Sequence, residues 1–256
     1  MCGRYASARK RVELLEEFSV QRDRVSEDLP PDYNVAPTKS VYAVLDREAG
    51  GVARELRVVR WGLVPSWAKD VSIGSRLINA RAETVSEKPS FRHAFARRRC
   101  LLPADGYYEW QVLEGAGPAG RKLKQPYFIH RADGRPLAFA GLYELWRDAR
   151  VPDGEAGAWL WTATVITTTA PDDLGQIHDR MPMVIAPESW ADWLNPGKRD
   201  VTELRALLTP AAGRGLVSYP VSTEVNSVRN NGPELVDPVP APLGAGRGRW
   251  SDQDEE

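Results

Sequence analysis

Short runs of β-forming residues, separated by turns and a few helical stretches, constrain the fold of this chain more than any other feature of its sequence. Ser40 to Asp46 and Ala53 to Trp61 are rich in such residues, and in the second run Leu56 and Val58 alternate with charged residues, as in a half-buried strand. Further strands are expected within residues 100–110, 127–130, 137–142, 160–168, 181–185 and 216–221. Because strand and helix do not alternate regularly, a doubly wound parallel sheet is not expected. The sequence predicts one α+β domain whose mixed or antiparallel sheets form a barrel-like core flanked by short α-helices.

Helical spacing of apolar residues is confined to short segments. A first helix is expected over residues 7–18, where Ser7 can cap the N-terminus and Val12, Leu15 and Phe18 recur at helical spacing. Other helices are expected over residues 90–98, 171–178, 189–194 and 200–208. From residue 239 onward Pro, Gly, Arg and acidic residues predominate. We therefore expect a folded domain over residues 1–238 and a disordered, Pro/Gly-rich acidic tail over residues 239–256.

The composition limits the classes of protein to which the chain can belong. It contains two cysteines, Cys2 and Cys100, and three histidines. Two cysteines do not form a disulfide framework, and without paired Cys spacing a structural zinc site is not expected. No apolar run is long enough to cross a bilayer, and the start of the chain lacks the basic and apolar regions of a secretory signal. We therefore expect a cytoplasmic, reduced protein without a metal or a membrane.

The charge distribution leaves nucleic-acid binding open. The net charge is −1, and the last ten residues hold two Arg and four acidic residues, so the rest of the chain carries +1. A basic cluster of Arg92, His93 and residues 97–99 could contact phosphates, although the same pattern suits a solvated helix face. Trp61 and Trp67 bracket a Gly/Pro loop, where aromatic rings can stack on bases, although Trp is as often a core residue.

The first residues carry the most distinctive chemistry. Removal of Met1 would leave Cys2 with a free α-amine and a thiol, whose ordinary pKa values are about 8 and about 8.5. An aldehyde can form an imine with the amine, after which the sulfur closes a thiazolidine ring. An ester or amide carbonyl would instead be attacked by the sulfur, with the amine as its base. The same residue is also compatible with an ordinary frayed terminus.

Three further side chains are candidates for acid, base or binding roles. Asn79 can hold a carbonyl oxygen or a sugar hydroxyl, and Arg81 shares its face of a strand by period two. Glu109 stands among aromatic residues, and partial desolvation raises the pKa of a carboxyl toward general acid–base use. His178 can shuttle a proton near neutral pH. Each has an ordinary alternative: an Asn that caps a turn, an exposed Glu on an edge strand, and a structural His.

Several motifs follow one another in the order found in one family. They are Met1-Cys-Gly-Arg-Tyr5, Tyr33-Asn-Val-Ala-Pro-Thr38, Trp61-Gly-Leu-Val-Pro65, Asn79-Ala-Arg-Ala-Glu83, Arg99-Cys-Leu-Leu-Pro103, Gly106-Tyr-Tyr-Glu-Trp110, Phe139-Ala-Gly-Leu-Tyr143 and Ile177-His-Asp-Arg-Met-Pro182. The chain closely resembles the SOS response-associated peptidase family, the abasic-site processing proteins. The resemblance runs from residue 2 to about residue 235, and leaves out the acidic tail and the loops at 111–122 and 149–157.

The resemblance implies a sensor of abasic sites in single-stranded DNA, including junctions with duplex. Cys2 would capture the aldehyde of the ring-opened sugar as a thiazolidine DNA–protein crosslink that shields the lesion. Asn79 would hold the opened sugar, Glu109 would support ring opening and proton transfer at the amine, and His178 would act in ring opening and crosslink reversal. The residues implied in DNA binding are Arg4, Pro37, Thr38 and Arg81 along the strand, Leu63 and Trp67 at the junction, and Thr167, Thr168 and Arg180 at phosphates or sugars.

The resemblance also implies the protein's setting. No cofactor is needed, since imine and thiazolidine formation require only proton transfers. We expect a monomer that is cytoplasmic and associated with the nucleoid when bound to DNA. The family name adds an autocatalytic peptidase activity at residue 1, although ordinary aminopeptidase removal of Met1 is sufficient.

Two alternative functions remain open on the sequence. An N-terminal-nucleophile amidotransferase or peptidase also begins Met-Cys-Gly and uses the Cys thiol with its α-amine as base. Such enzymes usually carry an Asn-Gly oxyanion element, whereas Asn231-Gly232 lies late, near a Pro-rich end. A non-catalytic DNA-binding module that uses residues 92–99 is the second alternative.

Overall fold

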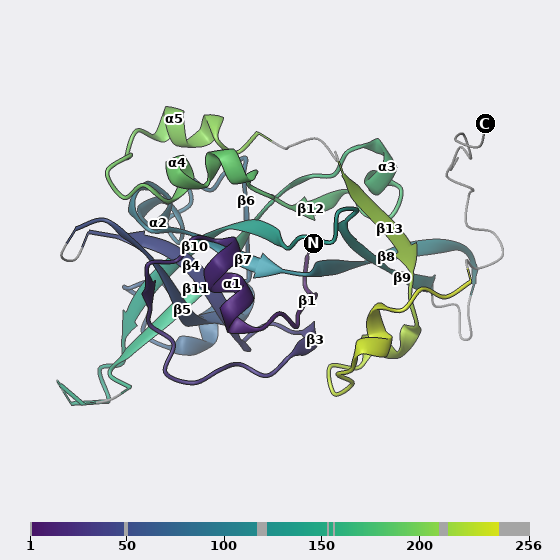
Figure 1. The fold of residues 1–256 in the computed structure, drawn as a ribbon, viewed down its shortest axis with the longest axis horizontal. Coiled ribbons are helices and arrows are strands. Elements are labelled where there is room, and N and C mark those ends of the chain that lie inside the picture. Colours follow the sequence, from purple (N-terminus) through teal and green to yellow (C-terminus); the bar gives the residue numbers. More distant parts are fainter. Residues whose placement is uncertain are drawn as a thin grey trace.

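The structure is a computed structural model that describes residues 2–48, 51–116, 122–152, 154–155, 157–209 and 215–240. It contains a closed barrel of five strands, whose labels lie in the left half of Figure 1. The strands are β1 (Tyr5–Ser7), β2 (Arg22–Asp23), β3 (Asp32–Val35), β4 (Ser40–Arg47), β5 (Ala53–Trp61), β6 (Asn79–Arg81), β7 (Arg99–Ala104), β8 (Gly106–Ala116), β9 (Lys122–Arg131), β10 (Leu137–Arg147), β11 (Trp159–Thr169), β12 (Arg180–Pro182) and β13 (Leu216–Pro220). The helices are α1 (Arg11–Glu17), α2 (Arg92–Arg97), α3 (Asp172–Gly175), α4 (Trp190–Leu194) and α5 (Val201–Ala206). Turns of 3₁₀-helix cover Val71–Arg76, Pro187–Ser189, Thr223–Asn226 and Pro233–Val236.

Parallel pairing between β5 and β11 closes the barrel. Around the ring the strands follow the order β11, β10, β7, β4 and β5, and these neighbours run antiparallel. β5 then returns to β11 with Arg60 opposite Thr162 and Trp61 opposite Ala163. Closure leaves no free edge on the ring itself. Past this contact β6 takes the place of β5 beside β11, with Asn79 paired to Val165. The ring thus positions Asn79 at one end of the barrel.

Alternate residues of the strands fill the barrel interior. In β4, the alternate residues Val41, Ala43 and Leu45 belong to the hydrophobic cluster that fills this interior, as the two-residue period of a strand requires. Small residues make room where the strands approach most closely. A Cβ added at Gly141 would lie 2.8 Å from the Sγ of Cys100. The interior is therefore a close-packed core and not a channel.

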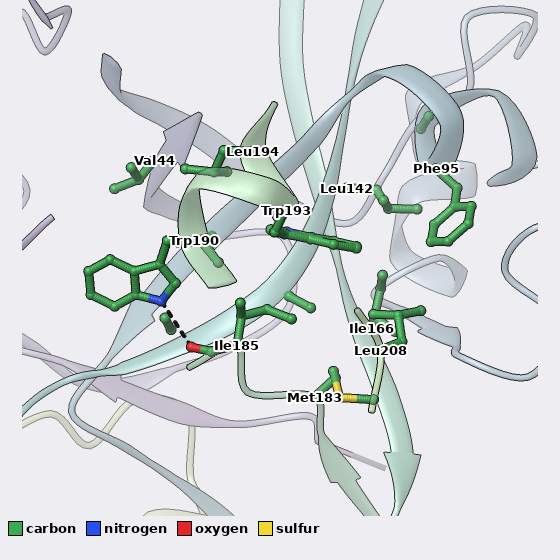
Figure 2. Packing of buried hydrophobic residues seen from close by; sticks show 14 of the residues in the cluster. Val44, Phe95, Leu142, Ile166, Met183, Ile185, Trp190, Trp193, Leu194 and Leu208 are labelled. Carbon is green, nitrogen blue, oxygen red and sulfur yellow. Dashed lines mark hydrogen bonds between the residues drawn. The ribbon is translucent and has the colours of Figure 1, made fainter. Parts of the chain in front are cut away.

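Helices cover the outer face of the barrel. The buried apolar residues between these helices and the barrel form a second hydrophobic cluster, part of which Figure 2 shows. Phe18 stacks on Trp190 with ring centroids 4.6 Å apart. The indole nitrogen of Trp190 donates to the carbonyl of Ile185 at 2.9 Å. The buried guanidinium of Arg99 joins β7 to this layer, since it donates to carbonyls of Phe95, Trp193, Asn195 and Lys198. Burial lowers the pKa of Arg99 to about 10.

A second sheet, with strand order β13-β9-β8-β1-β3, packs beside the barrel and carries the start of the chain. Within it Tyr5 of β1 pairs with Val35 on one side and Tyr107 on the other. Tyr5 and Tyr107 belong to the cluster of the barrel interior, whereas Ala6 and Tyr108 face the opposite side. The sheet therefore presses the first residues against the barrel.

These observations confirm the predicted α+β class with a barrel core. The first helix differs from the expectation, because Ser7 pairs with Asp32 in the second sheet and the helix begins only after Lys10. Consequently Val12 is 64% exposed, and Leu14 is buried in its place. Of the expected tail only Val239 and Pro240 are among the described residues, and Met1 and residues 117–121 also lie outside them. No helix in the described ranges is long and apolar enough to cross a membrane.

Candidate active site around Cys2

Cys2 lies between the second sheet and the barrel and has no exposed surface. Its neighbours in this core cluster include Tyr5 and Tyr107, whose rings meet Phe139 edge-on with centroids 5.7 and 6.1 Å away. Burial raises the pKa of the Cys2 thiol well above its ordinary value, and the charge of Glu109 adds to this effect. The thiol is therefore protonated at neutral pH and needs a base before its sulfur can act as a nucleophile.

Asn79 contacts the backbone of Cys2 directly. Its Nδ2 donates to the carbonyl oxygen of Cys2 at 2.7 Å, across the junction between β6 and the start of the chain. The preceding residue is also held, because the indole nitrogen of Trp61 donates to the carbonyl of Ile78 at 2.9 Å. The Oδ1 of Asn79 is buried and has no partner among the described residues. This oxygen is available to accept a hydrogen bond from a hydroxyl of a bound molecule.

Glu109 faces the same side of β8 as Tyr107, two residues earlier. The side chain is almost fully buried, and this burial raises the pKa of its carboxyl to about 7, with the charge of Asp179 adding to the effect. Because the charge of Glu109 also raises the pKa of the Cys2 thiol, the two groups lie close enough to interact. A carboxyl that is about half protonated at neutral pH can both donate and accept a proton.

His178 stands between α3 and β12, and the preceding Ile177 belongs to the same core cluster as Cys2. Burial lowers the pKa of His178, so the ring is neutral at pH 7. Nδ1 lies 3.0 Å from the backbone nitrogen of Arg180 and 2.9 Å from the carboxylate of Asp179, and it cannot serve both as acceptor and as donor. A neutral ring beside the highly exposed Asp179 favours the Arg180 amide as donor, which places the imidazole proton on Nε2.

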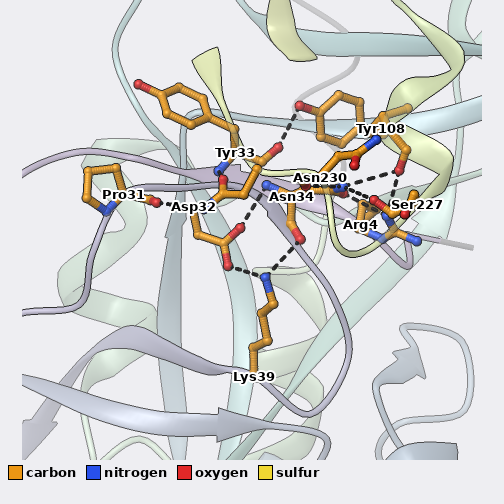
Figure 3. Close-up of polar contacts among 11 residues, drawn as sticks. Arg4, Pro31, Asp32, Tyr33, Asn34, Lys39, Tyr108, Ser227 and Asn230 are labelled. Atoms are coloured by element: carbon orange, nitrogen blue, oxygen red, sulfur yellow. Dashed lines mark hydrogen bonds and ion pairs between the residues drawn. The ribbon is translucent and has the colours of Figure 1, made fainter. Parts of the chain in front are cut away.

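Arg4, expected at the DNA strand, is anchored by Asn34 and the C-terminal segment (Figure 3). Its Nη1 donates to the Oδ1 of Asn34 at 2.7 Å and to the carbonyl of Val225 at 2.8 Å. The Nδ2 of Asn34 in turn donates to the carbonyls of Ser227 and Asn230, each at 2.9 Å. Arg4 therefore presents a guanidinium whose position is set before any ligand arrives.

Arg180, expected at a phosphate, is occupied by a carboxylate of the chain. Its Nη1 and Nη2 bind the two oxygens of Glu83 at 2.6 and 3.0 Å, and Nη2 also donates to the carbonyl of Thr167 at 2.7 Å. Thr167 has no exposed surface, and its hydroxyl approaches the carbonyl of Ala80 at 3.5 Å. A phosphate would have to displace Glu83 before it could reach the fork of Arg180.

The loop residues expected at the strand and the junction differ in exposure. Thr38 is exposed and has a positive φ of 73°, and its backbone nitrogen donates to the carbonyl of Trp61 at 2.9 Å, while the adjoining Pro37 is half-buried. Trp67 is 59% exposed, whereas Leu63 has no exposed surface and packs against the outer face of the barrel. Leu63 therefore supports this loop from below, and only the indole of Trp67 is presented to a ligand.

The two remaining candidates, Arg81 and Thr168, lie near the end of β11. Arg81 pairs with Thr167 and is exposed. Thr168 is nearly buried and lines a cavity of about 250 Å³ together with Met181 and Met183. Thr168 thus faces this cavity, whereas the side chain of Arg81 is open to solvent.

Sequence reasoning did not select Asn34, Glu83 or the two buried tyrosines beside Cys2. Asn34 and Glu83 each lie within one of the motifs quoted above. Their polar side chains inside these motifs were the signal that could have identified them. The hydroxyls of Tyr5 and Tyr107 are buried and have no hydrogen-bond partner among the described residues. No sequence pattern predicts this. The described ranges contain no group of three or more His, Cys, Asp or Glu side chains placed to hold a metal ion.

Comparisons with known proteins give matches over most of the chain. A family model described as SOS response associated peptidase (SRAP) matches residues 1–228. The abasic site processing protein YoqW of Bacillus subtilis (strain 168) is 40% identical over 237 residues, which cover 93% of this chain and 99% of that protein. The abasic site processing protein HMCES of Gallus gallus is 35% identical, covering 82% of this chain and 66% of its own length. A solved structure of a protein from Bacteroides thetaiotaomicron has a TM-score of 0.77 at 26% identity, covering 93% of this chain and 100% of the other.

Proposed function

The chain belongs to the SOS response associated peptidase family, and we propose that it processes abasic sites by capturing them in single-stranded DNA as a thiazolidine through Cys2. The observation that carries the proposal is the placement of Cys2. This residue, second in the chain, is enclosed beside a carboxyl whose pKa is about 7 and an amide that binds its backbone. The domain proposed for this activity covers residues 1–238, of which Met1 is removed.

The first step joins the amine to the aldehyde. After removal of Met1, the α-amine of Cys2 attacks C1′ of the ring-opened sugar and forms a hemiaminal. Glu109, in its protonated form, donates a proton to the hydroxyl of the hemiaminal, which leaves as water and yields a protonated imine. Asn79 keeps the amine in place through the Cys2 carbonyl, and its Oδ1 accepts a hydrogen bond from a sugar hydroxyl.

The second step closes the ring. The Cys2 thiol is neutral because its pKa is raised, so the sulfur cannot attack unaided. Glu109, left as a carboxylate by the first step, removes the thiol proton while the sulfur bonds to the carbon of the protonated imine and the C=N electron pair moves to the positively charged nitrogen, which ends as a neutral N–H. The net reaction consumes the aldehyde and releases one water. Glu109 ends protonated, as it began, so one carboxyl serves both steps.

His178 would act before capture, when the closed sugar opens to its aldehyde. Opening removes a proton from the anomeric hydroxyl and delivers one to the ring oxygen. A neutral imidazole with its proton on Nε2 can donate a hydrogen bond to the ring oxygen and polarise the C1′–O bond, while Glu109, which can both accept and donate, moves the protons. The same hydrogen bond would assist reversal of the crosslink. The exposed side chains of Trp67, Thr38 and Arg81 would contact the DNA around the lesion.

Mass spectrometry of the mature protein with an abasic oligonucleotide tests the proposal. We expect an adduct whose mass is the sum of the two molecules minus one water, stable in denaturant, and absent in Cys2→Ala. Cys2→Ser keeps the amine and should give only an imine that borohydride can trap. Glutamine hydrolysis without any adduct would overturn the proposal in favour of an amidotransferase, and binding without an adduct would favour a DNA-binding module.

A further inference from the structure

An open groove lies on the far side of the second sheet from Glu109. It has a volume of about 480 Å³ and is lined by Arg4, Trp110, Lys122, Leu123, Lys124 and Asn226. Glu109 and Trp110 are consecutive in β8, so their side chains emerge on opposite faces of the sheet. The groove therefore belongs to a different face from the thiol and carboxyl of the Cys2 site. We call it the hairpin groove, since β8 and β9 supply most of its lining.

The lining of the hairpin groove is cationic and aromatic. None of its residues is acidic, and neither Lys122 nor Lys124 forms an ion pair with a described carboxylate. The guanidinium of Arg4 lies over the Trp110 ring, 5.9 Å from its centroid, and the Trp110 indole nitrogen donates to Asn226 at 2.6 Å. An occupant with regularly spaced negative charges and flat apolar faces would match this surface, and single-stranded nucleic acid has both.

The groove begins two residues from Cys2. Consecutive Cα atoms are about 3.8 Å apart, so the Cα atoms of Arg4 and Cys2 are separated by no more than about 7.6 Å along the backbone. β1 begins at Tyr5, opposite Tyr107, and runs antiparallel to β8, which continues to Ala116. The edge of β8 beyond Tyr107 therefore adjoins the start of the chain. A strand held covalently at Cys2 can pass over this edge and bring its neighbouring nucleotides to Arg4.

We propose that the hairpin groove holds the single-stranded arm on one side of the lesion, with phosphates at Lys122 and Lys124 and a base against Trp110. This inference rests on the proposed function and adds to it the path of the strand. Because the groove is on one side of Cys2 only, its contribution depends on where the lesion lies in the oligonucleotide.

The test measures binding without crosslinking. The mature protein is titrated with single-stranded oligonucleotides that carry a tetrahydrofuran analogue, which has no aldehyde, placed at the 5′ end, the centre or the 3′ end. Lys122→Gln/Lys124→Gln is compared with Lys88→Gln/Arg199→Gln, which removes the same charge from exposed positions outside the groove. The loss of two phosphate contacts should lower the slope of log affinity against log salt by about 1.4 for the central lesion.

We expect Lys122→Gln/Lys124→Gln to lower the salt slope for the oligonucleotide with the central lesion and for one of the two with a lesion at an end. The oligonucleotide with the lesion at the opposite end should show no change. An equal loss with the control pair, or an equal loss at both ends, would overturn the proposal, since either would mean that net charge alone is responsible. Unchanged DNA binding with weaker binding of an oligoglutamate peptide would also overturn it and assign the groove to an acidic protein partner. Adduct formation by each variant with a true abasic site, measured separately, reports whether the Cys2 chemistry itself holds.

Discussion

Replacing Glu109 with Gln tests the electrostatics of the Cys2 site, because it removes a titrating group with little change in volume. Burial raises the pKa of this carboxyl from 4.5 to about 7. A carboxyl whose pKa is higher in the folded state binds its proton more tightly there, so its ionisation disfavours folding. At about 1.4 kcal/mol for each tenfold change in proton affinity, ionised Glu109 costs the folded state about 3 kcal/mol above pH 7.

The stability difference between the variant and the parent should therefore depend on pH in a defined direction. Below pH 4.5 neither state of the parent is ionised at Glu109, and the difference keeps a constant baseline. Between pH 4.5 and pH 7 the Glu109→Gln variant should gain in free energy of unfolding relative to the parent, levelling off about 3 kcal/mol above the baseline. Urea unfolding of both proteins at pH 4, 5.5, 7 and 8.5, followed by tryptophan fluorescence, measures this.

The same variant should lose activity while it gains stability. Without the proton acceptor, crosslinking to an abasic oligonucleotide should slow by about 10²–10⁴-fold, while binding of the tetrahydrofuran analogue stays nearly unchanged. A difference in unfolding free energy that is flat or falls with pH would refute the raised pKa of Glu109. An unchanged rate of crosslinking would refute its part in proton transfer, and an equal loss of binding would assign it a structural role.

Three further predictions concern the barrel, the anchor of Arg4 and the start of the chain. Gly141→Ala should lower the free energy of unfolding by about 1–3 kcal/mol, because the new Cβ meets the Sγ of Cys100, and adding Cys100→Ala should restore part of the loss. Asn34→Ala should cost about 1–3 kcal/mol in denaturant unfolding and weaken DNA binding, since Arg4 loses its anchor; unaltered binding would contradict the anchoring. A protein that keeps Met1 under an N-terminal extension should bind DNA but give no adduct on a denaturing gel, and crosslinking at the full rate would contradict the need for a free amine.

The predicted first helix shows where local pattern fails. Ser7 is a good capping residue and Phe18 lies at helical spacing. In the structure, however, Ser7 pairs in the second sheet with Asp32, 25 positions later in the chain, and local propensity does not predict this pairing. Val12 consequently faces solvent. The pairing of Trp61 with Ala163 that closes the barrel could not be predicted from local pattern either, because the sequence of a strand does not show which distant strand it pairs with.

The candidate site divides in a similar way. Cys2, Asn79, Glu109 and His178 were selected from residue chemistry and from motif order, both of which the sequence carries in full. The sequence could not show whether Arg180 is accessible to a phosphate, since this depends on the ion pair that Arg180 forms with Glu83 of another segment.

The sequence by itself determined the reactive groups, an aminothiol at position 2 and a carboxyl among aromatic residues, and the run of strands that can form a barrel. Only the tertiary structure decided their state. Enclosure between the barrel and the second sheet is what raises the pKa of the Cys2 thiol and of Glu109, because the cost of holding a charge depends on how much water the whole fold excludes.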